Sequence, residues 1–385
     1  MRFVAVGSTL VLLSYASLAL AQAPSADVVP VPVAEPPPEA VLPKKLAVGK
    51  QGFLVPGVQL QFWTYGQRQN VGGEQDLTSY FRIRRAEIRV KGEIVPGLFA
   101  YNVMVDPARA LEFDTRSIGV TPLDPAQAQP GTVSLAQPNG ATTIFQDLIL
   151  TFLSDYADVS FGQFKLPIGY EAYNNTARLI MPEFALVTRY FSARRDLGIK
   201  VDKKLGDYFY YRLDLLNGAG QNRLDNDDQK DGAVRLEAYP FPGLTLGVAG
   251  YAGLNRRAHA VTKDRLEADL RLDYANVLVQ GEFIHGWDGA TGAPRSEARG
   301  FYGALGYTFA KKLQPLVRVG HLNPRVSGAV PGAITASNDR VWSYEAGVNY
   351  FIQGYDLELQ LSAGVFDYQT VANIYHGIFE VQVAF

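Results

Sequence analysis

The chain has 385 residues, no cysteine and a formal net charge of −2, with 36 basic against 38 acidic side chains. This balance argues against a nucleic-acid-binding protein, which normally carries a basic excess. The lack of cysteine excludes disulfide scaffolds, thiolate metal sites and cysteine nucleophiles. Because only four scattered histidines remain for metal or acid–base chemistry, we expect no cofactor, no metal site and no enzymatic activity.

The N-terminus has the features of an export signal. Met1-Arg2 provides a positive start, Val4 to Leu20 is largely apolar, and Ala19-Leu20-Ala21 fits a small-x-small cleavage site. We therefore predict a removable signal peptide over residues 1–21, with an uncleaved membrane anchor as the less favoured alternative. The stretch that follows is rich in proline, which disfavours helices and central strands, so residues 22–56 are predicted to form an extended periplasmic linker.

From about Gly57 onward, side-chain polarity alternates with a period of two, which is typical of β-strands. The clearest example is Arg265 to Tyr274, where every second residue is charged and the residues between are apolar. On a strand, all of these charges face one side. The C-terminal segment alternates in the same way and ends on the aromatic Phe385.

The connections between these segments alternate in length. Short turns are predicted at 95–97, 154–158, 204–207, 239–243, 274–276, 310–313 and 353–355. Longer connections are predicted at about 67–79, 107–142, 166–195, 217–231, 253–263, 287–299, 323–339 and 367–373. Short turns at one end and long loops at the other are typical of a transmembrane antiparallel β-barrel of the outer membrane. We predict an all-β barrel of about sixteen strands over residues 57–385, rather than a soluble sandwich or propeller.

The second face of each strand is highly charged, and charges cannot be buried dry without partners. A barrel of about sixteen strands is wide enough for an aqueous channel. We therefore predict passive diffusion of small hydrophilic solutes through a charged lumen. The basic residues expected along the solute path are Arg82, Arg84, Arg85, Arg89, Lys91, Arg189, Arg194, Arg195, Lys200, Arg212, Arg235, Arg265 and Arg271.

The segment Phe81 to Lys91 carries the densest run of these cations. Its alternation changes phase at Arg84-Arg85, which predicts a β-bulge or the upper edge of the membrane band at that point. Two interpretations remain open. The arginines could form a cationic ladder that attracts anions and replaces their hydration, or they could pair with lumen carboxylates in a cross-strand charge network.

The connection from Leu166 to Arg195 contains two apolar runs, Leu179 to Met181 and Phe184 to Val187. An exposed extracellular loop would not normally present that much apolar surface. We predict that it packs inside the barrel or against a neighbouring subunit; packing on adjacent loops only is the alternative.

Three stretches, Phe81 to Gly92, Gly162 to Glu171 and Arg194 to Ile199, resemble the phosphate-selective porin O/P family, and the resemblance extends over Gly57 to Phe385. It implies a homotrimer of sixteen-stranded barrels in outer-membrane lipid, with inward-folded loops and a lumen that passes small anions such as phosphate. Arg84 and Arg85 are the residues that match the family's stacked arginines. The many lumen carboxylates depart from the family pattern. A general or weakly cation-selective porin therefore remains an alternative, ahead of an outer-membrane hydrolase or a non-conducting structural barrel.

Overall fold

A computed structural model of the chain describes residues 45–71, 73–111, 144–192, 194–225, 229–253, 261–290, 295–327, 336 and 338–385. The predicted signal peptide, most of the predicted linker and most of the predicted connection at 107–142 lie outside these residues. No helix in the described part of the chain is long and apolar enough to cross a membrane.

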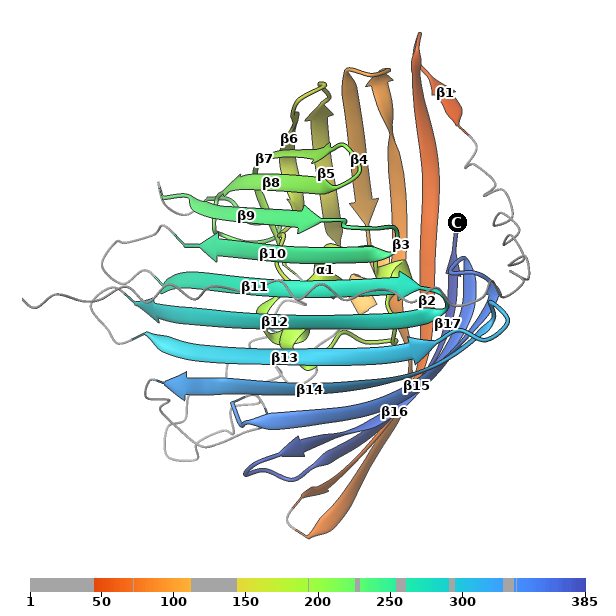
Figure 1. The fold of residues 1–385 in the computed structure, drawn as a ribbon, viewed down its shortest axis with the longest axis vertical. Helices are drawn as coiled ribbons and strands as arrows, with labels where there is room; N and C mark the ends of the chain where they lie inside the picture. Colours follow the sequence, from red (N-terminus) through yellow and green to blue (C-terminus); the bar gives the residue numbers. More distant parts are fainter. Residues whose placement is uncertain are drawn as a thin grey trace, which may run out of the picture. The chain divides into compact units, whose positions relative to one another are not determined.

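The molecule is built on one closed antiparallel sheet. Strands β2 to β17 each pair with their neighbours in sequence, and β17 pairs with β2 to close the ring of sixteen (Figure 1). The strands are β2 (Gly52–Val71), β3 (Glu74–Val95), β4 (Phe99–Val105), β5 (Phe145–Phe152), β6 (Asp158–Lys165), β7 (Arg195–Leu205), β8 (Phe209–Leu216), β9 (Asp231–Ala238), β10 (Leu244–Ala252), β11 (Val261–Tyr274), β12 (Val277–Ala290), β13 (Ser296–Tyr307), β14 (Leu313–Ser327), β15 (Val341–Gln353), β16 (Leu357–Tyr368) and β17 (Ile374–Ala384).

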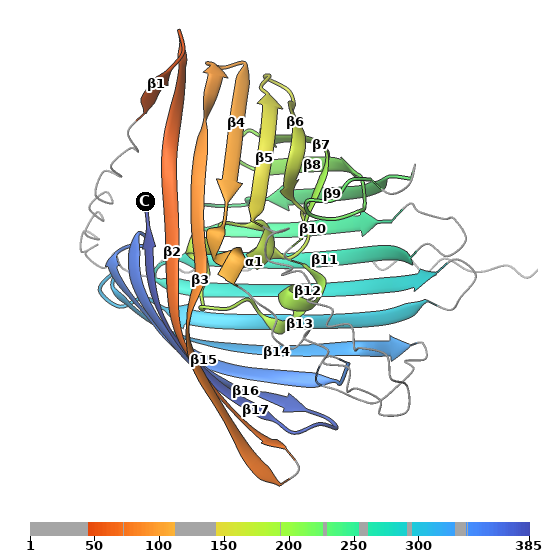
Figure 2. The same ribbon diagram turned by 180° about the vertical axis from the view of Figure 1, so that it is seen from behind.

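The remaining elements are short. Strand β1 (Leu46–Val48) pairs only with the start of β2, and a 3-10 helix, η1 (Pro107–Leu111), follows β4. The connection between β6 and β7 contains α1 (Tyr170–Tyr173), η4 (Thr176–Arg178) and α2 (Leu186–Phe191). Figure 2 shows α1 surrounded by the strands of the barrel.

The predicted short turns lie at one end of the barrel. The turn between β11 and β12 shows why they are tight: Ala275 and Asn276 both adopt positive φ, at 50° and 68°. Two successive residues with positive φ form the type of two-residue turn whose twist matches that of paired strands. The C-terminus lies at the same end, where Phe385 exchanges backbone hydrogen bonds with Val58 (2.8 and 2.9 Å).

The two faces of the wall are inverted relative to a soluble protein. Along β11, Arg265, Glu267 and Asp269 are buried inside the barrel, whereas Leu266 and Leu270 are exposed on its outer surface. Exposed aromatic side chains also gather beside the short turns, among them Tyr156, Tyr208, Tyr274 and Phe309. An apolar outer band with an aromatic girdle at its edge is the surface that a lipid bilayer requires.

Three predicted boundaries are corrected by the structure. Residues 67–79 were predicted to form a long connection, but β2 and β3 continue through them and turn between Val71 and Glu74. Gly73, with a φ of 93°, permits this tight turn. This part of the hairpin extends beyond the apolar band of the barrel. Its residues are therefore mostly polar and lack the alternation of apolar and polar side chains by which membrane strands are predicted. Strands β12, β13 and β14 likewise extend into the predicted connections at 287–299 and 323–339.

The barrel also begins earlier than the predicted linker boundary at residue 56, because β2 starts at Gly52 and contains Pro56. A strand tolerates proline at a position where its backbone nitrogen has no neighbouring strand to donate a hydrogen bond to. The Val58 N–H points toward β17 and donates to Phe385, so the nitrogen of Pro56, two residues earlier, faces the same side. On that side β1 pairs only as far as Leu54 and β17 only from Gln59, which leaves a gap opposite Pro56.

Candidate pore constriction

The connection between β6 and β7, residues 166–194 and hereafter the constriction loop, folds into the barrel rather than over its rim. Its turns are set by local chemistry: the Asn175 side chain accepts a hydrogen bond from Ala177 N at the start of η4. Gly169, which precedes α1, has a φ of 82°, and a Cβ at this position would lie 2.2 Å from Ser192 Oγ. Only glycine therefore fits where the two ends of the loop meet.

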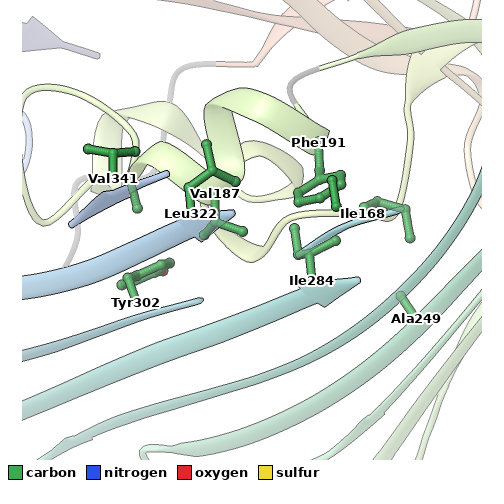
Figure 3. Packing of buried hydrophobic residues seen from close by; sticks show 10 residues of the cluster. Ile168, Val187, Phe191, Ala249, Ile284, Tyr302, Leu322 and Val341 are labelled. Atoms are coloured by element: carbon green, nitrogen blue, oxygen red, sulfur yellow. The ribbon is translucent and has the colours of Figure 1, made fainter. Parts of the chain in front are cut away.

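Apolar packing holds the loop against the wall. Val187 and Phe191 project from α2 toward Leu322 and Ile284 of the barrel (Figure 3), and all four are almost fully buried. A second cluster joins Ile180 and Met181 of the loop to wall residues Leu278, Ala304 and Leu316. Burying each large apolar side chain contributes about 1.5–3 kcal/mol. The prediction that this segment packs inside the barrel is confirmed.

Polar side chains of four consecutive strands also bind the backbone of the loop. Four loop carbonyls between Ala177 and Glu183 accept these bonds, and the donating strand moves back from β17 to β14 as the loop advances: Gln382 of β17 to Ala177 O (3.0 Å), Gln360 of β16 to Leu179 O (3.0 Å), Asn349 of β15 to Ile180 O (3.0 Å) and Arg318 of β14 to Glu183 O (3.1 Å). Each bond satisfies a carbonyl that would otherwise be buried unpaired. The loop is thus fastened along one side of the lumen.

Arg318 is the most connected of these donors. Besides Glu183 O, its guanidinium contacts Glu345 of the neighbouring strand (2.8 and 3.0 Å) and Glu171 of the loop (3.4 Å). Glu171 also accepts from Ala185 N (2.7 Å). Burial raises the pKa of Glu171, and the charge of Arg318 opposes that rise. The ion pair therefore ties a buried loop carboxylate to the wall.

The β-bulge predicted in the arginine-rich segment is confirmed. Gln61 of β2 lies opposite Arg85, and the next residue, Phe62, lies opposite Ile83, so Arg84 is the extra residue. Because a bulge shifts the alternation by one residue, Arg84 and Arg85 are both buried inside the barrel although they are adjacent in sequence. Two guanidinium groups thereby face the constriction loop from one place on the wall.

The loop meets these arginines with Glu183 and Phe184. Glu183 lies 3.3 Å from Arg84 Nη2, and the Arg85 guanidinium lies 5.2 Å from the centre of the Phe184 ring. Burial alone would raise the pKa of Glu183, but the charges of Arg84, Arg189 and Arg85 outweigh it and hold that pKa well below its usual range. Glu183 is therefore ionised at neutral pH.

The other cations of the predicted path fall into two groups. Several form ion pairs across or along the wall, which is the charge network of the second interpretation: Arg195–Asp147 (2.7 Å), Lys200–Asp202 (2.8 Å), Arg212–Asp214 (2.7 Å), Arg265–Asp288 (2.6 Å), Arg271–Asp273 (3.4 Å) and Arg235 with Glu237, Glu267 and Asp269 (2.6, 3.3 and 2.9 Å). Arg195 thus binds Asp147 and does not join Arg84 and Arg85.

The second group is more open. Arg89 lies 3.7 Å from Glu87, and Arg82 lies near the Trp63 ring. Lys91, Arg189 and Arg194 are exposed and form no ion pair with any described residue. The hydrogen bonds from the side-chain amides of Gln382, Gln360 and Asn349 to the constriction loop were not predicted. Their only sequence signal is that polar residues recur on the inner face of the last strands.

A closed barrel with a lipid-compatible outer band, a charged interior and a loop folded into the lumen defines a porin-type channel of the bacterial outer membrane. No group of three or more metal-binding side chains occurs among the residues that the structure describes. The family model for phosphate-selective porin O and P matches residues 58–267, more than half of the chain. The protein belongs to this family.

Solved structures support the same fold. The anion-selective porin from Comamonas acidovorans superposes with a TM-score of 0.56 at 8% identity, covering 87% of this chain and 100% of that one. The outer membrane channel DcaP of Acinetobacter baumannii gives 0.58 at 10% identity, covering 88% and 99%. The trimer form of OmpT, an outer membrane protein of Vibrio cholerae, gives 0.54 at 12% identity, covering 86% and 99%. No curated protein has a significantly similar sequence.

Proposed function

We propose that this porin favours small anions, phosphate among them, over cations. The observation that carries the proposal is a difference in exposure between lumen cations and lumen carboxylates that lack ion-pair partners. Lys91, Arg194 and Arg223 are exposed and have no such partner among the described residues. Solutes passing through the lumen would therefore meet these positive charges first.

Three lumen carboxylates without basic partners are hidden instead. Glu282, Glu358 and Glu380 are at most 3% exposed, and the part of the chain described here gives none of them an ion pair. Each is approached by a neutral donor: Thr188 for Glu282 (3.3 Å), Gln382 for Glu358 (2.9 Å) and Trp63 for Glu380. Most other lumen carboxylates are neutralised by the wall ion pairs. A positive field reaching the aqueous path raises the local concentration of anions.

The pair Arg84 and Arg85 would add to this positive field from the wall beside the constriction loop. Glu183 neutralises part of the charge of Arg84, whereas Arg85 Nη2 has no hydrogen-bond partner among the residues that the structure describes. Because both guanidinium groups are buried, they would act on a passing anion through their charge rather than by direct contact. If the wall ion pairs instead cancel the field, the protein would act as a general or weakly cation-selective porin.

Two further features belong to the proposal. Export would depend on the signal peptide over residues 1–21, which predicts Gln22 as the first residue of the mature protein when its N-terminus is sequenced. The likeness to the trimer form of Vibrio cholerae OmpT supports a homotrimer in outer-membrane lipid. Light scattering of the purified protein in detergent should then give three times the mass of one chain.

Liposome swelling tests the selectivity. Proteoliposomes should take up small anions faster than neutral or cationic solutes of equal size. The variant Lys91→Gln/Arg194→Gln/Arg223→Gln should reduce this preference. The matched control Lys204→Gln/Lys311→Gln/Lys312→Gln removes the same charge from exposed residues at the short-turn end and should change it little. Equal uptake of anions and cations by the wild type would contradict the proposal.

A further inference from the structure

A cavity of about 290 Å³ lies on the long-loop side of the constriction loop. Its lining comes from both ends of the constriction loop, from the start of β7, from the connection between β8 and β9, and from β10 and β11. This volume is roughly ten times the share of one water molecule in the liquid, about 30 Å³. It is larger than an inorganic oxyanion needs.

The charge of this cavity is strongly positive. Five basic side chains line it against one carboxylate, Asp196. Arg195 and Arg265 are neutralised by Asp147 and Asp288. The other three cations, Arg194, Arg223 and Lys263, form no ion pair with any residue that the structure describes. A ligand of this cavity should therefore be negatively charged.

Part of the lining is apolar. Ile168 and Phe191 are almost fully buried, and the Arg265 guanidinium lies 5.3 Å from the centre of the Phe191 ring. Ser192 also lines the cavity; it is 6% exposed, and its Oγ has no hydrogen-bond partner among the residues described.

From these features we propose that the cavity binds small organic anions in which a carboxylate is attached to a flat apolar body. The carboxylate would lie among Arg194, Arg223 and Lys263, and the apolar body would lie against Ile168 and Phe191. The inference rests on the proposed function, since it names an anion class that enters through this mouth. It goes beyond phosphate because a phosphate ion has no surface to place on the apolar wall.

Single-channel recording of the purified full chain tests the proposal, with benzoate as the probe and acetate and inorganic phosphate for comparison. Benzoate added on the long-loop side should block the current transiently and more strongly than acetate or phosphate. The variants Arg223→Gln and Lys263→Gln should each weaken the block by up to about fivefold, the range for one exposed ionic contact. Lys312→Gln, at the short-turn end, removes the same charge and should leave the block unchanged.

Three results would overturn the proposal: no benzoate block, a block of equal strength by phosphate, or a block weakened as much by Lys312→Gln as by Arg223→Gln. If any of these occurs in channels that still favour chloride over potassium, the organic-anion site fails and the anion porin stands. If the wild-type channel favours potassium, the proposed function itself fails.

Discussion

Replacing Arg318 with methionine should loosen the constriction loop without removing any loop residue. The guanidinium is 1% exposed and joins Glu171 and Glu183 of the loop to Glu345 of the wall. Removing one partner of a buried ion pair costs about 3–5 kcal/mol, because the remaining charge stays buried. Glu171 keeps its bond from Ala185 N and Glu345 keeps His376 at 3.4 Å, so we take the lower end, about 3 kcal/mol.

In the docked state the constriction loop lies against the wall, and in a displaced state it has left the wall. Displacement would return the Glu171 and Glu345 carboxylates to water, so the loss of about 3 kcal/mol shifts the equilibrium toward the displaced loop. At about 1.4 kcal/mol for each factor of ten, the docked fraction should fall roughly a hundredfold relative to the displaced one. Single-channel recordings of Arg318→Met should show a wider, noisier conductance level that is rare in the wild type. Adding Glu171→Gln should restore part of the docked behaviour, because it removes one unpaired charge.

Lys200→Met is the matched control. Lys200 pairs with Asp202 on the same strand at 2.8 Å, so this variant also breaks an ion pair of the wall, but no contact with the constriction loop is lost among the described residues. It should leave the conductance levels unchanged. The reasoning is refuted if Arg318→Met shows wild-type levels and noise, or if Lys200→Met disturbs them equally.

Three shorter predictions concern the same region. Gly169→Ala would place a methyl group against Ser192 at a strained positive φ, and increased channel noise should report a loop destabilised by about 1–3 kcal/mol. The stabilisation that ionised Glu183 gives the docked loop is present above the ordinary pKa of about 4.3 and is lost only as the pH falls through its lower docked-state pKa. Channel noise should thus stay constant from about pH 7 to about pH 4; a rise near pH 5 would contradict this assignment. Deleting Arg84 removes the bulge but leaves Arg85 opposite Gln61 and Ile83 opposite Phe62, so the other side chains keep their faces and the heat-resistant folded band on gels should persist; loss of that band would contradict this register.

The barrel could be predicted from the sequence because its period of two and its loop lengths are local features. The bulge was predictable for the same reason, since the alternation visibly slips at Arg84-Arg85. The apolar runs of the constriction loop likewise predicted that it would be buried. In each case the residues that carry the signal are neighbours in the chain.

The details of the site depend on residues distant in sequence. Gln382 binds Ala177 O across 205 positions, and Arg235 meets carboxylates of β11 only because of the strand register. Periodicity shows that these side chains face the lumen, but it does not show which partner each one meets. Hence the sequence left two equal alternatives for the arginines, a cationic ladder that attracts anions and a network of ion pairs with lumen carboxylates. The structure contains a large part of the ion-pair network. The polar hairpin of β2 and β3 was missed because it extends beyond the apolar band.

The most direct test of the account is the zero-current potential of the purified channel in a planar bilayer that separates concentrated from dilute potassium chloride. With exposed cations along the path and the unpaired carboxylates Glu282, Glu358 and Glu380 buried, chloride should carry most of the current. The dilute side should then become negative, at every pH where the carboxylates are ionised. A potential of the opposite sign, or none, would contradict the proposed anion preference.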